Sequence, residues 1–150
     1  IHRICIKHQC KMKQFIKKKV SKETSYRMSR ITGKNTNPER YVRSILHKNG
    51  FRFSLHKKDL PGKPDIVLKR YKTVINVNGC FWHQHEDCKY ACLPKTKTDF
   101  WKNKLEGNKK RDKLKQSQLN DLGWKIINVW ECEIKDKKVH LFSKLKDISQ

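Results

Sequence analysis

The sequence is poor in acidic residues. It has 14 Asp and Glu against 37 Lys and Arg among 150 residues, which gives a formal net charge of +23. A surface this basic is suited to bind a polyanion through counterion release, and nucleic acid is the first candidate. The alternative is a drift toward Lys in an AT-rich coding sequence, which the abundance of Lys, Asn and Ile also fits. Charge alone therefore favours a nucleic-acid partner without establishing one.

Long apolar runs are also missing. None approaches the roughly 20 residues of a membrane span, and the N-terminus shows no apolar stretch of a secretory signal. We therefore expect a cytoplasmic protein, close to the nucleoid if it binds DNA, and no membrane partner. With 150 residues, of which 35% are hydrophobic, the chain can form one domain with a compact core.

A regular disulfide framework is absent as well. The six cysteines are unevenly spaced, at positions 5, 10, 80, 88, 92 and 132, and three of them lie close to histidines. This pattern argues against a secreted disulfide-rich fold. It indicates a metal site in a reducing compartment instead.

The charge is unevenly distributed along the chain. Residues 1–35 contain 11 Lys and Arg but one acid, Glu23, and their apolar residues follow no period. We expect a flexible basic arm over 1–35, which either touches phosphates non-specifically or has no role. We expect the folded domain over 36–150.

Helices and strands can be predicted over the folded domain. A capping box of Thr36 and Glu39 predicts the start of a helix that ends at Asn49–Gly50. Apolar alternation and turn residues predict strands at 51–55, 65–68, 72–78 and 124–130, and helices at 99–122 and 137–148. This order of elements predicts an α/β sandwich with a mixed sheet.

Cysteine and histidine are concentrated in the segment NGCFWHQHEDC, residues 78–88. Their spacing, with a distant cysteine just after a predicted strand, fits a closed tetrahedral zinc site. The predicted ligands are Cys80, His85, Cys88 and Cys132. His83 and Cys92 are competing ligands, and buried cysteines with surface histidines are the alternative. A zinc ion with four protein ligands has no open position, so it would be structural and not catalytic.

Asp65 follows Pro64 at the start of a predicted strand. A carboxylate at this place can hold a hard cation such as Mg²⁺. Many DNA-cleaving folds add an acid-x-Lys motif on the next strand, but here that strand offers Asn76, Val77 and Asn78. A simple Pro-Asp turn without a site is therefore the alternative.

Aromatic and polar residues near the metal segment suggest contacts with DNA. Trp82 and Trp101 lie among Lys and polar residues, where they either stack on bases or pack as a small second core. Asn108 and Asp112 interrupt the apolar face of the long helix, so they point at a site or are hydrogen-bonded inside. Arg111 beside them could pair with Asp112 or with a phosphate.

Seven separated segments, from about Ser21 to Glu133, resemble the very-short-patch-repair (Vsr) DNA mismatch endonucleases. They are MSRITGKNTNPE, DLPGKPDIVL, NGCFWHQHEDCKY, LPKTKTDFW, NKKRD, LGW and VWEC. The resemblance implies a restriction-endonuclease-like three-layer sandwich with structural zinc. It also implies a Mg²⁺-dependent nick in double-stranded DNA, 5′ of the T in a T:G mismatch, which arises by deamination of 5-methylcytosine. We expect a monomer, with mismatch-repair proteins as candidate partners.

The resemblance also implies roles at matching positions. Asp65 would bind Mg²⁺ through its carboxylate and Val77 through its main-chain carbonyl, while His83 would activate or position the water. The zinc ligands would be Cys80, His85, Cys88 and Cys132, and the wedge beside the mismatch would be Phe81, Trp82 and Trp101. Positions near the site or the DNA are Glu39, Asn108, Arg111 and Asp112; we assign Glu39 to the catalytic group, although its helix cap is a sufficient explanation.

Asn78 departs from the family pattern, because many members have His there. An Asn side chain forms hydrogen bonds but exchanges no proton near neutral pH. Either activity is reduced, or His83 carries the proton transfer alone. A zinc-containing DNA-binding module with weakened catalysis is therefore one alternative, and a related nuclease on the same fold without mismatch specificity is another.

Overall fold

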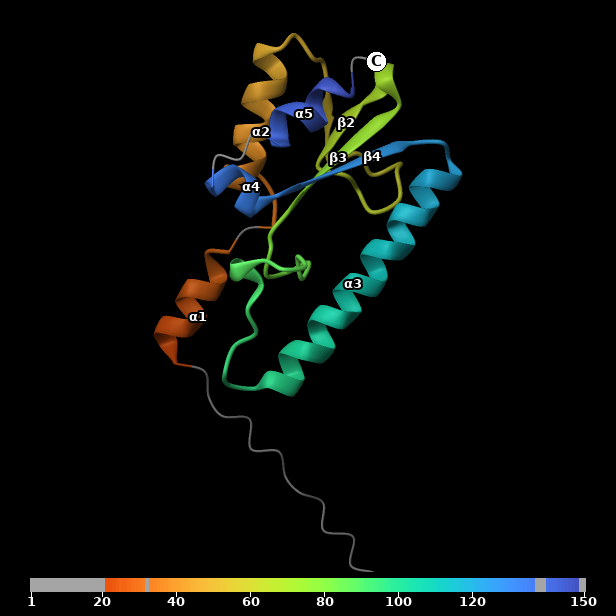
Figure 1. Cartoon of the computed structure of the whole chain (residues 1–150). Helices are drawn as coiled ribbons and strands as arrows, with labels where there is room; N and C mark the ends of the chain where they lie inside the picture. Colours follow the sequence, from red (N-terminus) through yellow and green to blue (C-terminus); the bar gives the residue numbers. More distant parts are fainter. Residues whose placement is uncertain (1–20, 32, 137–139, 149–150) are drawn as a thin grey trace, which may run out of the picture. The chain divides into compact units, whose positions relative to one another are not determined.

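The computed structural model describes residues 21–31, 33–136 and 140–148, and its contacts divide the chain into two units, Ile1–Thr32 and Gly33–Gln150 (Figure 1). In the first unit, helix α1 spans Lys22–Ser29. It begins where the Ser21 hydroxyl accepts the Thr24 N–H, and Glu23 favours the positive end of the helix. The basic-arm prediction did not include this helix. Residues 1–20 of the predicted arm lie outside the described part.

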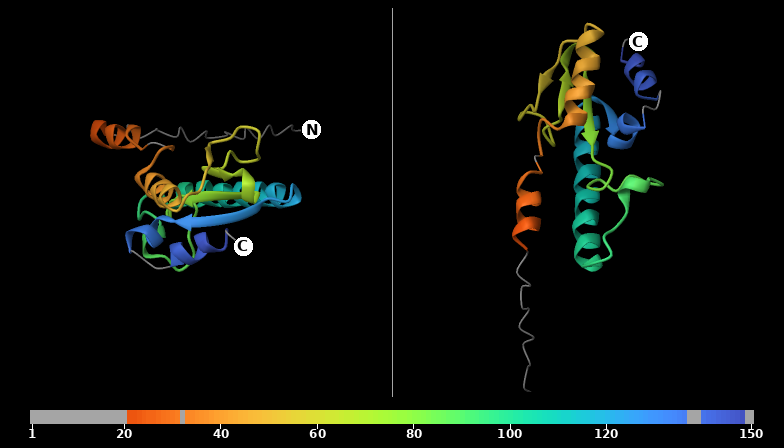
Figure 2. Two further views of the ribbon diagram at one scale, coloured as in Figure 1. Left: turned by 90° about the horizontal axis from the view of Figure 1, so that it is seen from above. Right: turned by 90° about the vertical axis from the view of Figure 1, so that its left-hand side faces the viewer.

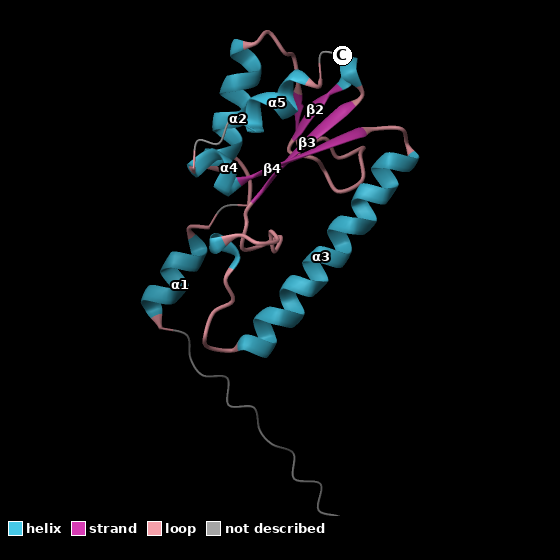
Figure 3. Cartoon of the chain, in the orientation of Figure 1, coloured by secondary structure: helices cyan, strands magenta, loops and turns pink. Residues whose placement is uncertain are grey.

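The second unit is built on a four-stranded mixed sheet with the order β1-β2-β3-β4 (Figure 3). The strands are β1 (Ser54–Leu55), β2 (Ile66–Leu68), β3 (Thr73–Asn78) and β4 (Lys125–Trp130). The first three strands pair antiparallel, whereas β3 and β4 are parallel. The predicted mixed sheet is confirmed.

Helices cover both faces of this sheet (Figure 2). Helices α2 (Asn37–Lys48) and α5 (His140–Lys146) lie on one face, and the long helix α3 (Thr98–Asp121) lies on the other. Because side chains alternate along a strand, Ile66 and Leu68 join the core under α2, and Val67 joins a smaller core with Leu119 of α3. The domain therefore has three layers.

Helix α2 forms as the capping box predicts. The Thr36 hydroxyl accepts the Glu39 N–H, and the Glu39 carboxylate accepts the Thr36 N–H. Its apolar stripe buries Val42, Ile45 and Leu46 against the sheet. This cap places Glu39, which is itself buried, near the end of the sheet that carries the candidate site.

One predicted strand was too long, and one short helix was not predicted. The strand expected at 51–55 has two paired residues, because the Phe51 N–H closes the end of α2 on the Leu46 carbonyl and the Phe51 ring packs on Tyr71. A short helix, α4 (Glu131–Lys135), follows β4 and was not predicted. Of the helix expected at 137–148, residues 137–139 lie outside the described part. No helix within the described ranges has the length and apolar character needed to cross a bilayer.

The β3-α3-β4 unit places the functional segments together. Parallel strands end at the same edge of a sheet, so the segment after β3 and helix α4 after β4 meet there. Helix α3, which connects the two strands, runs alongside the segment that follows β3 (Figure 1). This edge carries the predicted metal, catalytic and aromatic residues.

Candidate active site and metal centre

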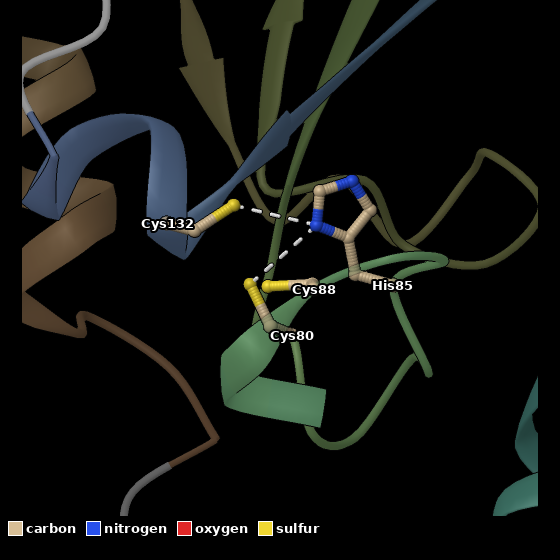
Figure 4. A group of neighbouring side chains, drawn as sticks. All are labelled: Cys80, His85, Cys88 and Cys132. Carbon is tan, nitrogen blue, oxygen red and sulfur yellow. Dashed lines mark hydrogen bonds between the residues drawn. The ribbon is translucent and has the colours of Figure 1, made fainter. Parts of the chain in front are cut away.

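Four side chains converge at this edge to form the Cys/His cluster: Cys80, His85, Cys88 and Cys132 (Figure 4). Their ligand atoms all lie within 4.8 Å of one another, although Cys132 comes from α4 and the other three from the segment after β3. His85 Nδ1 lies 3.3 Å from Cys132 Sγ and 3.9 Å from Cys80 Sγ. Tetrahedral zinc–sulfur bonds of about 2.3 Å require ligand separations of roughly 3.8 Å. The donor set and its spacing therefore fit a closed metal site.

Burial raises the pKa of two of the three thiols in this cluster. The apolar surroundings raise the pKa of the Cys80 thiol to about 12 and also raise the pKa of Cys132. Both thiols therefore stay protonated near neutral pH until a metal replaces the protons. The His85 ring stacks on Trp130 at a centroid distance of 4.0 Å, which fixes the direction of its ligand nitrogen.

The two competing ligands lie elsewhere. Cys92 is exposed and its thiol donates to the Lys89 carbonyl. His83 places Nδ1 2.6 Å from Asp112 Oδ2 on α3. A carboxylate accepts, so Nδ1 carries a proton, and in the neutral ring Nε2 is the nitrogen with the lone pair. His83 and Asp112 therefore form a histidine–carboxylate pair beside the Cys/His cluster.

A second group of ionisable side chains, the Asp65 group, comprises Glu39, His56 and Asp65, whose ligand atoms also lie within 4.8 Å of one another. Asp65 Oδ2 accepts the main-chain N–H of Val77 at 2.9 Å. Oδ1 accepts no hydrogen bond from the described residues, and the side chain keeps 24% exposure. Burial raises the pKa of Asp65, and the nearby Glu39 raises it further. A partly exposed carboxylate oxygen next to a sheet end can take a hard cation.

Glu39 differs from Asp65 because both of its oxygens are occupied. Oε1 accepts the Thr36 hydroxyl at 3.0 Å, and Oε2 accepts the Asn35 N–H at 3.0 Å and an Arg43 N–H at 2.8 Å. Its side chain is only 4% exposed. This bonding is sufficient to explain Glu39 as the cap of α2.

The predicted wedge residues pack on one another in an aromatic cluster of Phe81, Trp82, Phe100 and Trp101. Phe81, Trp82 and Trp101 meet edge to face, at centroid distances of 5.1 to 6.0 Å. Phe100 extends the cluster and is 57% exposed. The three wedge rings are partly exposed, so they do not form a buried core. The cluster is suited to stack on or insert between bases.

Asn108 and Arg111 hold this cluster to helix α3. The Asn108 amide donates to the Trp82 carbonyl at 3.2 Å, and its oxygen accepts from the Arg111 guanidinium. Arg111 is exposed, so its remaining donors face solvent. Asn108 therefore contacts the aromatic cluster directly, and Arg111 contacts it through Asn108.

Sequence reasoning missed four residues of this region: Arg43, His56, Phe100 and Lys104. The Lys104 ammonium lies 5.5 to 5.8 Å from the centroids of three rings in the aromatic cluster. Its position three residues after Trp101 could have indicated this, because residues i and i+3 share a helix face. His56 had no such signal, since its partners are distant in sequence.

Comparison with known proteins is consistent with this geometry. The family model "DNA mismatch endonuclease Vsr" matches residues 16–90. The chain is 49% identical over 111 residues to the type II nicking enzyme V.XorIIP of Xanthomonas oryzae pv. oryzae, covering 74% of this chain and 81% of that protein. It is 38% identical over 114 residues to the DNA mismatch endonuclease Vsr of Escherichia coli, covering 76% and 72%. The chain therefore belongs to the Vsr family of DNA mismatch endonucleases.

Proposed function

We propose that this protein is a Mg²⁺-dependent endonuclease that nicks one strand of double-stranded DNA 5′ of the T in a T:G mismatch. The observation that supports this most is the shared location of three features. Asp65, just before β2, is hydrogen-bonded to Val77 near the end of β3. His83, on the segment that follows β3, pairs with Asp112 of α3, and the aromatic cluster joins the same segment to α3. One surface can thus contact a base step and a phosphate together.

Asp65 is the proposed Mg²⁺ ligand, with the main-chain carbonyl of Val77 beside it. The Val77 N–H donates to Oδ2 at 2.9 Å, and Oδ1 accepts no hydrogen bond from the described residues. When bound, the cation would supply positive charge to the scissile phosphate and the departing oxygen. The chain itself supplies a held carboxylate that the partly exposed site keeps open to water and DNA.

His83 is the proposed group that acts on the attacking water. Asp112 accepts its Nδ1–H, so Nε2 is the nitrogen that can take a proton. Asn78 ends β3 and cannot exchange a proton near neutral pH, so this role falls on His83 alone. Glu39 would contribute indirectly, because it caps α2 and holds Arg43 in place.

Selectivity would come from the aromatic cluster. Insertion beside a base pair requires a few kcal/mol of unstacking, and a mismatched pair unstacks at lower cost than a matched one. A zinc ion in the Cys/His cluster would fix both sides of Phe81 and Trp82, because Cys80 precedes them and His85 follows. The rings would then be ordered before DNA binds, which reduces the entropy lost on binding.

Substrate, assembly and location follow from the same proposal. The +23 charge suits a monomer that surveys DNA non-specifically before it finds a mismatch. We place it in the cytoplasm, on the nucleoid, where mismatch-repair proteins are its candidate partners.

The test is a nicking assay with purified zinc-loaded protein, Mg²⁺, and a labelled duplex that carries one T:G pair, beside its matched control. We expect a nick 5′ of the T and none in the matched duplex. Omission of Mg²⁺ should abolish the nick. No nick in either duplex would overturn the proposal.

Asn78 favours one alternative, a DNA-binding module with weakened catalysis. Binding of the T:G duplex without any Mg²⁺-dependent nick would support it. Several relatives bear the name type II nicking enzyme, which keeps a nuclease without mismatch specificity as the other alternative. Equal nicking of matched and mismatched duplexes would favour that one.

A further inference from the structure

His56 has no role in the proposed function, yet it lies in contact with the residues that have one. It follows β1 with a φ of +44°, a left-handed conformation that non-glycine residues adopt rarely. Such a conformation persists where the surroundings determine it, and it is frequent at functional sites. The main-chain N–H of His56 donates to the Asp65 carbonyl at 3.4 Å, and its ring is mostly buried, with 19% side-chain exposure.

The ring could be a metal ligand together with Glu39 and Asp65, because the three ligand atoms lie within 4.8 Å of one another. The neighbours of Glu39 argue against this. Both of its oxygens are hydrogen-bonded, and the Arg43 guanidinium lies 2.8 Å from Oε2. A cation on that oxygen would have to displace Arg43 or lie against its positive charge. Glu39 is therefore a poor direct ligand.

The same Arg43 determines the tautomer of His56. Arg43 Nη2 lies 3.3 Å from His56 Nε2, within hydrogen-bonding distance, whereas Glu39 Oε2 lies 3.8 Å from the same nitrogen, beyond it. A guanidinium has donors but no acceptor, so Nε2 must accept this hydrogen bond. In a neutral imidazole the other nitrogen then carries the proton. Nδ1–H consequently faces Asp65, with Nδ1 3.9 Å from Oδ1.

We propose that His56 is a positioning residue that holds the Asp65 carboxylate for its cation through Nδ1–H, and that His56 is not a metal ligand. The inference rests on the proposed function, which makes Asp65 the cation ligand. A movement of about 1 Å brings Nδ1 and Oδ1 to hydrogen-bonding distance. Val77 then donates to one carboxylate oxygen and His56 to the other, and the Arg43 guanidinium, paired with Glu39, holds His56 Nε2. Each carboxylate oxygen has two lone pairs, so Oδ1 keeps one for the cation, and Asp65, unlike Glu39, has no guanidinium on its oxygens among the described residues.

Two variants distinguish the roles of the two ring nitrogens of His56. In His56→Asn, the amide N–H can take the place of Nδ1–H, and Asn tolerates the left-handed backbone better than most residues. In His56→Gln, the longer side chain reaches the Nε2 position, so it can accept from Arg43 but offers Asp65 no donor. Both variants remove the imidazole, which makes them a matched pair.

The readout is Mn²⁺ binding to the zinc-loaded protein, followed by electron paramagnetic resonance, with Asp65→Ala to identify the contribution of this site. We expect the Kd for Mn²⁺ to rise about 10- to 100-fold in His56→Gln, the effect typical of a group that orients a ligand. His56→Asn should stay close to wild type. Thermal unfolding of both variants verifies that they fold.

Three results would overturn the inference. An equal rise of the Kd for Mn²⁺ in both variants would show that the ring is a metal ligand. No change of this Kd in either variant would show that the ring only packs against its neighbours. A wild-type protein without Asp65-dependent Mn²⁺ binding would also overturn it. Independently of any variant's folding, ¹⁵N NMR of the wild-type protein should show Nδ1 protonated, and a proton on Nε2 would contradict the proposal. Nicking of the T:G duplex by the wild-type protein is scored separately, so the proposed function can stand while the inference fails.

Discussion

The Cys/His cluster and the Asp65 group are two sets of potential metal ligands at one edge of the sheet, and they differ in how their donors are occupied. In the Cys/His cluster, four donor atoms face one point, and burial keeps the thiols of Cys80 and Cys132 protonated without a cation. In the Asp65 group, both oxygens of Glu39 accept hydrogen bonds from Arg43 or the α2 cap, whereas Asp65 Oδ1 accepts none from the residues that the structure describes. A closed set of four ligands suits a structural metal ion, whereas a partly exposed carboxylate suits a catalytic metal ion that must also bind water or substrate.

Removal of one cluster ligand should have the largest effect. Cys132→Ser leaves three ligands, and zinc sites of this kind contribute on the order of 10 kcal/mol to folding. We expect loss of bound zinc, measured by metal analysis, and a fall of the unfolding temperature by more than about 10 °C. Cys92→Ser is the matched control, because Cys92 is exposed and outside the cluster. A Cys132→Ser protein that retains zinc fully would refute the ligand set.

Asp65→Ala should reduce the nicking activity and leave the fold unchanged. We expect nicking to fall at least about a thousand-fold, because a bound cation contributes several kcal/mol to the transition state. Zinc content and the Kd for DNA should change little. Asp59→Ala, which removes an exposed carboxylate from the preceding turn, is the control. If Asp65→Ala also released zinc, the two sites would not be independent.

The His83–Asp112 pair should have a smaller effect on rate. We expect His83→Ala to reduce kcat by about a hundred-fold, the lower range for loss of an acid–base group. Asp112→Asn should reduce it less, and the double variant should be no slower than His83→Ala, since Asp112 acts through His83. Single-turnover nicking of the T:G duplex measures all three. Additive losses would show that Asp112 has a separate role.

The smallest expected effect is the change in unfolding temperature caused by the charge of Asp65. Burial raises the pKa of Asp65 above its ordinary value of about 4. As pH rises from the ordinary pKa of the unfolded chain toward the higher pKa of the folded protein, the unfolded chain loses this proton first. The free energy of unfolding therefore falls over this range and stays lower at higher pH. Without Mg²⁺, Asp65→Asn should raise the unfolding temperature at pH 7 by on the order of a few degrees, and the gain should shrink toward pH 4. Asp59→Asn should give no gain, because hydrogen bonding to its own main chain and the charge of Lys57 lower the pKa of Asp59.

Local signals in the sequence were enough to predict much of the fold. The Thr36 capping box located α2, and apolar alternation located β3 and β4. Phe51 was assigned to a strand because alternation cannot reveal that its N–H closes α2. Helix α4 was missed because five residues carry too little periodicity.

The candidate site was predictable where its residues lie close in sequence or match family segments. The cluster ligands and the wedge residues follow from NGCFWHQHEDC and the resemblance. Hydrogen bonds join Glu39 to Arg43 and Arg43 to His56, and the His56 ring lies 3.9 Å from Asp65, so this chain of contacts between α2 and the residues before β2 is created by tertiary packing. No spacing rule on one sequence reveals such a chain.

The parallel pairing of β3 and β4 places the ligands Cys80 and Cys132 at neighbouring strand ends, where one metal can join them. A metal held by Cys80 and Cys132 cross-links two strand ends that are 52 residues apart, and closing a loop of that length restricts the unfolded chain by roughly 4 kcal/mol. The link needs no oxidant, so it persists in a reducing cell. It depends on the ligands alone. Phe81 and Trp82 lie between these ligands, so a bound metal would hold their segment at both ends whatever the side chains at those two positions.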